Sequence, residues 1–529
     1  MGKNCFPMLF CSNSQQSKVR TLLRILLYQS LLLCFLLSSR GQLIEAIQLP
    51  PSVHPDWGYR TSLLAEGEML DPLLFWESEY WFQRSQLFPT AHLWWDSLSP
   101  NTGRVILKAR PRPTFSFSPT IWLSPFSSAI GVELQATTIS NPALLATYRI
   151  EMRNLRGSPA IRHTSRLQFQ GLSSLYLLGS LTGIYADSTR FFSLLIRRPV
   201  ERSDVALGAR LALYAIDDYY PLNQQRLRRS RIRLFNAFHL DVGSTLPLYF
   251  TAAIAVQKTL SSHHPLLRTF LDNTLSLLVG LTSLRQEYDT FQFLPDFTPV
   301  IPAGASGTVF FGKTFALDST ASSVVYLAGR AEQGAWLFHR SLYLYGAVSG
   351  GSGFANGNAV FTTQESEGRL HWQIDSSWFV RLYYHQRTHW NWRAFTQLFA
   401  GERFGVRGYA DVNRTGENRF IATAELHYML PQPWIPSISA VLFADVGAIW
   451  NQGDLFLRQP FFPAVGIGLH CQYRLFSLPR FLRLEGGVAI RSGQWFVQLS
   501  TQLPLPQFAN IQPPSIFFLG TDQDVELIP

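Results

Sequence analysis

Alternation of apolar and polar residues over about ten positions, repeated along 113–505, is the feature that most restricts how this chain can fold. In FFPAVGIGLHCQYRLF, every second residue contributes to an apolar face, and the residues between them are mainly small or polar. A tilted β-strand needs about ten residues to cross a bilayer, with one face towards lipid and the other towards the lumen. The pattern therefore predicts membrane-spanning strands. Similar runs occur at 203–217, 247–258, 273–284, 321–330, 376–385, 481–491 and 494–503.

The composition agrees with strands in a membrane. Charged residues make up 15% of the chain, against roughly 25% in an ordinary soluble domain, while aromatic residues reach 14%. Only one segment, near the N-terminus, is apolar enough to form a membrane helix. A transmembrane β-barrel has such a composition because half of each strand faces lipid and half faces water. A large soluble all-β protein is the alternative.

The formal net charge of +10 raises the question of nucleic-acid binding. Most basic residues are single arginines on alternating strands, and RLRRSRIR (226–233) is the one real cluster. We expect this cluster to form either a solvated turn or a strand with a basic lumen face. Both interpretations fit a barrel better than a DNA-binding helix, so no nucleic-acid partner is expected.

The strand candidates predict the size of the barrel. About fifteen precede the stretch GERFGVRGYADV (401–412), and five follow it. The alternation is weakest between 113 and 175, and some of the candidates count as halves of one long strand. We therefore expect an all-β, antiparallel transmembrane barrel of about sixteen strands over 113–505.

The N-terminus has the layout of a secretory signal peptide. Basic residues precede the apolar run LLYQSLLLCFLLSS, and small residues follow it, so 1–41 is the expected signal. Cleavage after Gly41 or after Ala46 fits equally well, and a retained anchor is the alternative. Removal would take away three of the four cysteines and leave Cys471. A single cysteine cannot form an internal disulfide, so none is expected in the mature fold.

Residues 47–112 differ from the rest of the chain. In LDPLLFWESEYWFQRSQLF, Asp71 suits an N-cap and Pro72 the first helical position. Two short strands, AHLWWDSL and GRVILKAR, follow. A helix and two strands within this length predict a small α+β module ahead of the barrel. Its helix is expected to present one apolar stripe, made of Leu73, Trp76, Tyr80 and Leu87.

One nucleotide-binding pattern occurs and is rejected. GTVFFGKT (307–314) satisfies G-x-x-x-x-G-K-[ST], but its central residues favour an extended strand and no helix start follows it. The twelve histidines show no metal-binding spacing, and neither G-x-S-x-G nor H-E-x-x-H is present. We therefore expect no catalytic residue, no metal and no cofactor, which makes the protein a non-enzyme.

The stretch FGVRGYADV draws attention because it surrounds one arginine with glycines. A solvated loop is the simple interpretation. Together with VLFADVGAIW, however, it resembles the superfamily of the BamA and TamA assembly factors and the two-partner secretion transporters. The family carries V-R-G-[FY] at the tip of a loop folded into the barrel, F-x-D-x-G in a strand, and an acidic residue in the strand after the loop. The matching residues are Val406, Arg407, Gly408 and Tyr409, then Phe443, Asp445 and Gly447, and finally Glu425.

The alternation supports this inward loop independently. In IATAELHY, Glu425 lies opposite an apolar face and should point into the lumen. Asp445 would cost several kcal/mol if it faced lipid, so it should point inward too. The guanidinium of Arg407 offers five donors and can bridge two carboxylates with charge-assisted bonds. We therefore expect Arg407 to hold the loop 399–416 against the inner wall through Asp445 and Glu425.

The resemblance implies a bacterial outer-membrane β-barrel, with 47–112 as a single POTRA-like module in the periplasm and 506–529 as a C-terminal extension. It implies a factor that assembles or inserts β-barrel client polypeptides. A pore that secretes one partner exoprotein, and a barrel with a structural or transport role, are the alternatives. The implied partners are outer-membrane lipid and unfolded or exported client polypeptides, with periplasmic chaperones or accessory lipoproteins as further ones.

Overall fold

The computed structural model describes residues 42–501, apart from internal stretches. Several gaps of one to three residues occur, many of them between 72 and 89. The expected signal peptide and the C-terminal extension lie outside the described residues. The longer gaps are 199–204, 217–226, 241–247, 263–272, 291–299, 319–322, 392–397, 410–414 and 431–436.

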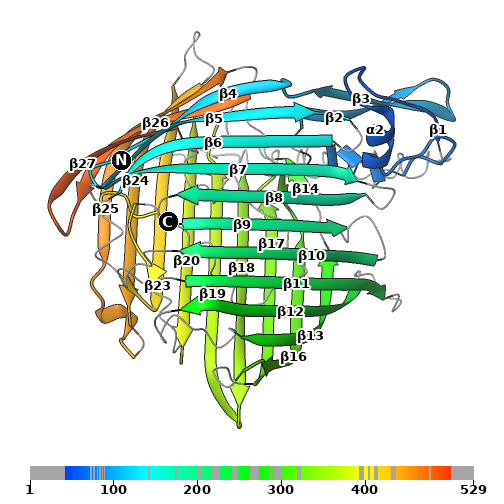
Figure 1. Cartoon of the computed structure of the whole chain (residues 1–529). Coiled ribbons are helices and arrows are strands. Elements are labelled where there is room, and N and C mark those ends of the chain that lie inside the picture. The colour runs from blue at the N-terminus through cyan, green and yellow to red at the C-terminus, as the bar shows by residue number, and fades with distance from the viewer. Residues whose placement is uncertain are drawn as a thin grey trace, which may run out of the picture.

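Twenty antiparallel strands form a closed barrel, in which each strand pairs with the barrel strands before and after it (Figure 1). The last strand returns to the first, so the barrel closes between β27 and β4. The strands are β4 (Phe115–Leu123), β5 (Ser127–Thr138), β6 (Ala143–Leu155), β7 (Ser158–Leu172), β8 (Leu177–Ala186), β9 (Thr189–Arg198), β10 (Val205–Ile216), β11 (Leu227–Leu240), β12 (Leu248–Ser262), β13 (Thr274–Arg285), β16 (Ala305–Ala316), β17 (Val324–Leu337), β18 (Leu342–Ala355), β19 (Asn358–Gln373), β20 (Trp378–Trp390), β23 (Asn418–Leu430), β24 (Ser437–Trp450), β25 (Phe462–Leu475), β26 (Leu478–Ala489) and β27 (Gln494–Ser500).

The expectation of about sixteen strands is wrong. Candidates in the first half of the chain that had been counted as halves of a longer strand are complete strands. Between 113 and 175, where the alternation is weakest, β4 to β7 are four complete strands of nine to fifteen residues. About ten residues suffice for a tilted strand to cross a bilayer, so no merging was needed. The five strands expected after the loop are present as β23 to β27.

The two faces of the strands differ as the alternation predicted. In β25, Val465, Ile467 and Leu469 are exposed on the outside, whereas Ala464 and His470 are buried on the inside. An apolar outer surface is what a barrel in lipid presents. The rejected nucleotide-binding pattern GTVFFGKT lies within β16 and is paired on both sides, with β13 and β17.

A small three-stranded sheet and helical segments precede the barrel. Residues 74–75, 78–79 and 81–82 are helical, within the stretch where the sequence predicted a helix. The sheet has the order β1-β3-β2, with β1 (Leu43–Gln48) parallel to β3 (Thr102–Arg110) and β2 (Thr90–Ser97) antiparallel to it. The sequence predicted β2 and β3 but not β1, which begins before residue 47. It also did not predict α2 (Pro55–Thr61), although Pro55 is at the helix start and Asp56 in its first turn. Of the expected helical stripe, Leu87 is buried, and the others, Leu73, Trp76 and Tyr80, lie outside the described residues.

This small unit packs against the barrel beside the ends of β5 to β7 (Figure 1). Its buried core includes Trp57 and continues into Leu145 of β6. The hydroxyl groups of Thr61 and Tyr176 lie 3.0 Å apart, so the contact with the barrel is polar as well as apolar. The N-terminal unit therefore shares a core with the barrel wall.

Four short strands and a 3-10 helix lie outside the barrel sheet. β14 (Tyr288–Thr290) pairs with β15 (Val300–Pro302), and β21 (Leu398–Phe399) pairs with β22 (Thr415–Gly416). The second pair forms the neck of the loop 399–416, and η5 (Phe456–Arg458) follows β24. In the described part of the chain, no helix is both long enough and apolar enough to span a membrane.

Candidate functional site

The loop 399–416 folds back on itself before it meets the barrel wall. Val406 N donates to Gly401 O at 2.9 Å, and Glu402 N donates to Tyr409 O at 3.0 Å. Gly405 and Gly408 have φ angles of +105° and +77°, a region that side chains with a Cβ rarely occupy. The two glycines therefore make the turn that presents the side chain of Arg407 to the wall.

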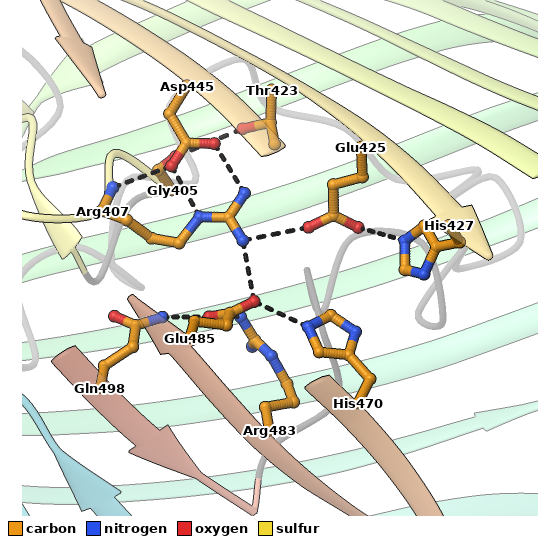
Figure 2. Close-up of polar contacts among 10 residues, drawn as sticks. All are labelled: Gly405, Arg407, Thr423, Glu425, His427, Asp445, His470, Arg483, Glu485 and Gln498. Atoms are coloured by element: carbon orange, nitrogen blue, oxygen red, sulfur yellow. Dashed lines mark hydrogen bonds and ion pairs between the residues drawn. The ribbon is translucent and has the colours of Figure 1, made fainter. Parts of the chain in front are cut away.

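Arg407 is bound by three carboxylates (Figure 2). Its Nε and Nη2 donate to Asp445 at 2.7 and 2.8 Å, and its backbone N donates to the same carboxylate at 3.1 Å. Nη1 donates to Glu425 at 3.2 Å and to Glu485 at 2.9 Å. The structure thus brings Arg407 together with both carboxylates named from the sequence and adds a third.

Three neighbouring regions of the inner wall supply these carboxylates. Glu425 lies on β23, Asp445 on β24 and Glu485 on β26, and each side chain is fully buried. The inward face of each strand follows from its period of two. Glu485 lies between the apolar positions Leu484 and Gly486 of the alternating run 481–491, which places it on the polar face, but nothing in the sequence links it to the loop. That link depends on the curvature of the wall, which brings β26 under the guanidinium.

A second layer of polar groups surrounds the carboxylates. His427 Nε2 lies 2.9 Å from Glu425, and His470 Nε2 lies 2.8 Å from Glu485. Arg483 donates to Glu485 at 2.6 Å, and Gln498 of β27 donates to the same carboxylate. The cluster is therefore connected from β23 to β27, and a change in one carboxylate disturbs several partners.

Burial and charge act on Arg407 in opposite directions. Desolvation alone would lower the pKa of this guanidinium, but the carboxylates of Asp445 and Glu485 outweigh it and hold the pKa above its usual value. The cation is therefore permanent. Removing it would take the shared cation away from three buried carboxylates, of which Glu485 would keep Arg483 as a donor.

The remaining residues of both motifs pack around the arginine. The guanidinium carbon of Arg407 lies 3.6 Å from the centre of the Phe443 ring, a cation–π contact. A Cβ on Gly447 would lie 2.6 Å from Cγ2 of Val406, so only glycine leaves room for the loop there. Tyr409 donates from its hydroxyl to Pro463 O at 2.8 Å. Each motif residue named from the sequence therefore takes part in the contact between the loop 399–416 and the inner wall.

The boundary between β27 and β4, called the seam below, is the shortest pairing in the barrel among the described residues. Leu499 pairs with Leu123, and Ser500 pairs with Trp122. The next shortest boundary, between β26 and β27, pairs seven residues. Within the described residues, strand pairing is therefore shortest where the barrel closes, with one further main-chain hydrogen bond from Thr501 N to Ile121 O at 2.9 Å.

One half of β27 lies beyond the end of its partner strand. β27 begins at Gln494, whereas its partner β4 ends at Leu123, so 494–498 have no strand partner on that side within the described chain. Trp495 and Val497 are 81% and 64% exposed on the outer face of this half. An apolar edge with free backbone groups is a template for another strand.

Among the described residues, no group of three or more histidine, cysteine, aspartate or glutamate side chains is arranged to hold a metal ion. The cluster around Arg407 is an ion-pair network, and each carboxylate in it is bound by a cation or a histidine. Its geometry holds a loop against a wall.

No protein-family model matches this sequence, and no curated protein matches it. In fold, the chain resembles the BamA and CdiB barrels. BamA from Haemophilus ducreyi lacking POTRA domains 1–3 is 11% identical, with 87% of this chain and 84% of that chain covered and a TM-score of 0.42. CdiB from Acinetobacter baumannii is 10% identical, with 87% and 73% covered and a TM-score of 0.46. CdiB from Escherichia coli is 11% identical, with 87% and 76% covered and a TM-score of 0.43.

Proposed function

We propose that the protein is an outer-membrane insertion factor that receives strands of unfolded β-barrel clients at the seam. The observation that carries the proposal is the short pairing of β27 with β4, which within residues 42–501 has two residue pairs against seven at the next shortest boundary. Each backbone hydrogen bond contributes about 1 kcal/mol, so this boundary opens at a smaller cost than any longer one.

The unpaired half of β27 suits the addition of a client strand. Its edge offers backbone donors and acceptors, and its outer face carries the exposed Trp495 and Val497. An incoming strand can pair with such an edge by β-augmentation, while its own apolar side chains enter lipid. Burial of those side chains supplies the free energy, so the proposed reaction needs no nucleotide, metal or other cofactor.

The proposal includes a location for each part. The barrel lies in the bacterial outer membrane, with its apolar outer face in lipid. The N-terminal unit, taken as a POTRA-like module, lies in the periplasm, where clients, chaperones or accessory lipoproteins can reach it.

A seam locked by a disulfide tests the proposal. In a variant whose native cysteines are replaced by serine, Leu123→Cys and Leu499→Cys would form a disulfide across the seam. The two residues are directly opposed and lie within disulfide range. The readout is the rate at which a urea-unfolded outer-membrane barrel folds into liposomes that contain the protein. We expect the oxidised variant to lose the acceleration and a reductant to restore it.

The matched control places the same lock at a well-paired boundary. Leu469→Cys and Leu484→Cys join opposed, outward-facing residues of β25 and β26. This lock should leave client folding unchanged. Client folding at the parent rate with the seam locked would refute the insertion proposal.

The number of strands favours a secretion pore as the second candidate. A barrel of twenty strands is wider than one of sixteen, because diameter grows with strand number, and a wider lumen gives a polypeptide more room. A secretion pore would still export its partner with the seam locked, since the client would pass through the lumen. Export that survives the lock, with no effect on client insertion, would decide for this candidate.

A further inference from the structure

We propose that Glu402 is a positioning residue that ties the loop 399–416 to the first barrel hairpin, so that the loop acts as a strap across the seam. The inference rests on the proposed function only in that opening of the seam would admit a client. The inference assigns a role to Glu402, which lies outside both sequence motifs. It also identifies the Glu402 carboxylate as the group that controls opening of the seam.

Glu402 reaches the turn between β4 and β5. Its Oε1 accepts a hydrogen bond from Ser124 Oγ at 2.8 Å and a second from Ser127 Oγ. The glutamate is only 6% exposed. Hydrogen bonds to a buried carboxylate are among the stronger ones, and removing the carboxylate would leave two hydroxyl donors without this acceptor.

The turn between β4 and β5 links the Glu402 contact to the seam through further hydrogen bonds. Ser124 Oγ accepts hydrogen bonds from Ser127 N at 3.0 Å and Phe126 N at 3.3 Å, and its hydroxyl hydrogen has two acceptors within reach, Glu402 Oε1 at 2.8 Å and Ser127 O at 3.0 Å. Ser127 Oγ accepts from Trp122 Nε1 at 3.0 Å while it donates to Glu402. Trp122 is one of the two residues of β4 that pair across the seam.

The same loop is bound on the other side of the seam. Arg407 is paired with Glu485 of β26, and Gly408 lies against the ring of Phe496 on β27, where a Cβ would come within 2.4 Å. Glu402 N is hydrogen-bonded to Tyr409 O, which joins the two ends of this bridge inside the loop. The loop therefore contacts the last strands and the first hairpin at the end of the seam where β27 has no strand partner.

Two separate connections between the first and last strands thus hold the barrel closed. One is the seam, with two residue pairs, and the other is the loop, anchored by Arg407 on one side and by Glu402 on the other. Loss of the Glu402 contact would leave the Arg407 anchor in place and free only the first hairpin. Seam opening and loop release are therefore separable by mutation.

Disulfide trapping measures the open fraction directly. The cysteine pair at Leu123 and Leu499 forms a disulfide only when the seam is closed, so a brief oxidation followed by quenching gives the ratio of open to closed barrels. We expect Glu402→Ala, which removes the acceptor of two hydrogen bonds, to raise this ratio at least about tenfold, the change that loss of one hydrogen bond to a charged group produces. Glu402→Gln keeps an acceptor oxygen and should restore most of the closure.

Two further variants keep the test independent of misfolding. Ser124→Ala with Ser127→Ala removes the donors and leaves Glu402 in place, and it should raise the ratio as Glu402→Ala does. Glu332→Ala is the matched control, because Glu332 on β17 is similarly buried and also accepts from a serine, Ser306 at 3.2 Å, but lies away from the seam. It should leave the ratio unchanged, and heat-modifiable migration verifies that each barrel is folded.

The outcomes separate the strap from the proposed function. An unchanged ratio in the serine double variant and in a folded Glu402→Ala barrel would overturn the strap. A raised ratio in Glu332→Ala as well would overturn it too, because the effect would then not be specific to the loop. A raised ratio in the Glu402 and serine variants but not in Glu332→Ala would sustain the strap. If client folding were at the same time unaffected by the seam lock, insertion at the seam would be refuted.

Discussion

The inner wall formed by β23 to β26 and the seam between β27 and β4 are adjacent, but they are held by different contacts. The wall has long strand pairings and a buried network of three carboxylates around Arg407. The seam has two residue pairs and an unpaired half strand. The difference places a firmly anchored loop beside the shortest boundary of the described barrel, which is the boundary that the proposed function requires to open.

The largest expected effect comes from the anchor of the loop. Arg407→Ala removes the shared cation of three buried carboxylates, and breaking a buried ion pair typically costs about 3–5 kcal/mol. We expect the loop to be released while the barrel stays closed along its other boundaries, since their hydrogen bonds do not involve the loop. Limited proteolysis within 399–416 measures the release, and heat-modifiable migration reports the barrel.

Arg330→Ala on β17 is a suitable control, because this arginine also binds a buried glutamate, Glu332 at 2.8 Å, but on another part of the wall. It should not expose the loop to protease. A loop that remains protected in Arg407→Ala would mean that apolar packing alone holds it, and the contrast between wall and seam would lose its basis.

A smaller effect is expected for Asp445→Asn. Arg407 keeps Glu425 and Glu485 in this variant, so loop release should be weaker than in Arg407→Ala. The double variant should be no worse than Arg407→Ala, because the two residues share one interaction. Additive protease sensitivity in the double variant would contradict the contact.

Arg407→Lys should rescue poorly, since one ammonium cannot replace a planar fork that reaches three carboxylates.

Gly447→Ala tests the packing part of the anchor. The added Cβ would lie 2.6 Å from Val406 Cγ2, and overpacking of this kind typically costs about 1–3 kcal/mol. We expect partial loop release by proteolysis. Val406→Ala should suppress it in the double variant by making room for the methyl group. A defect that Val406→Ala does not reduce would show that the glycine is needed for another reason.

The smallest effect is expected at the seam. Thr501 Oγ1 accepts a hydrogen bond from Ile121 N at 2.9 Å, next to the two residue pairs. Thr501→Val removes this acceptor with little change of shape, at a cost of about 1 kcal/mol. The disulfide-trapping ratio should rise modestly, while protease sensitivity of the loop should stay at the parent level. Release of the loop in this variant would show that the wall and the seam are not independent.

The sequence predicted most of the loop site and less of the barrel around it. Glu425 could be named because the period-two alternation places it on an inward face, and Asp445 because it belongs to the F-x-D-x-G motif and would be costly in lipid. Glu485 was on the correct face, but no local pattern linked it to Arg407, 78 residues away. The strand number was wrong because short complete strands and halves of long strands look alike in sequence. α2 was missed because a helix of seven residues, about two turns, carries little periodicity.

By itself, the sequence determined the class of fold, the two faces of each strand and the residues of the loop motif, since each of these depends on neighbours along the chain. Only the tertiary structure decided where the barrel closes, how short the seam is and what Glu402 touches. Glu402 and Ser124 are 278 residues apart, and the pairing of β27 with β4 joins the two ends of the barrel sequence. Such contacts arise when twenty strands close into a ring, because closure selects partners that no local pattern encodes.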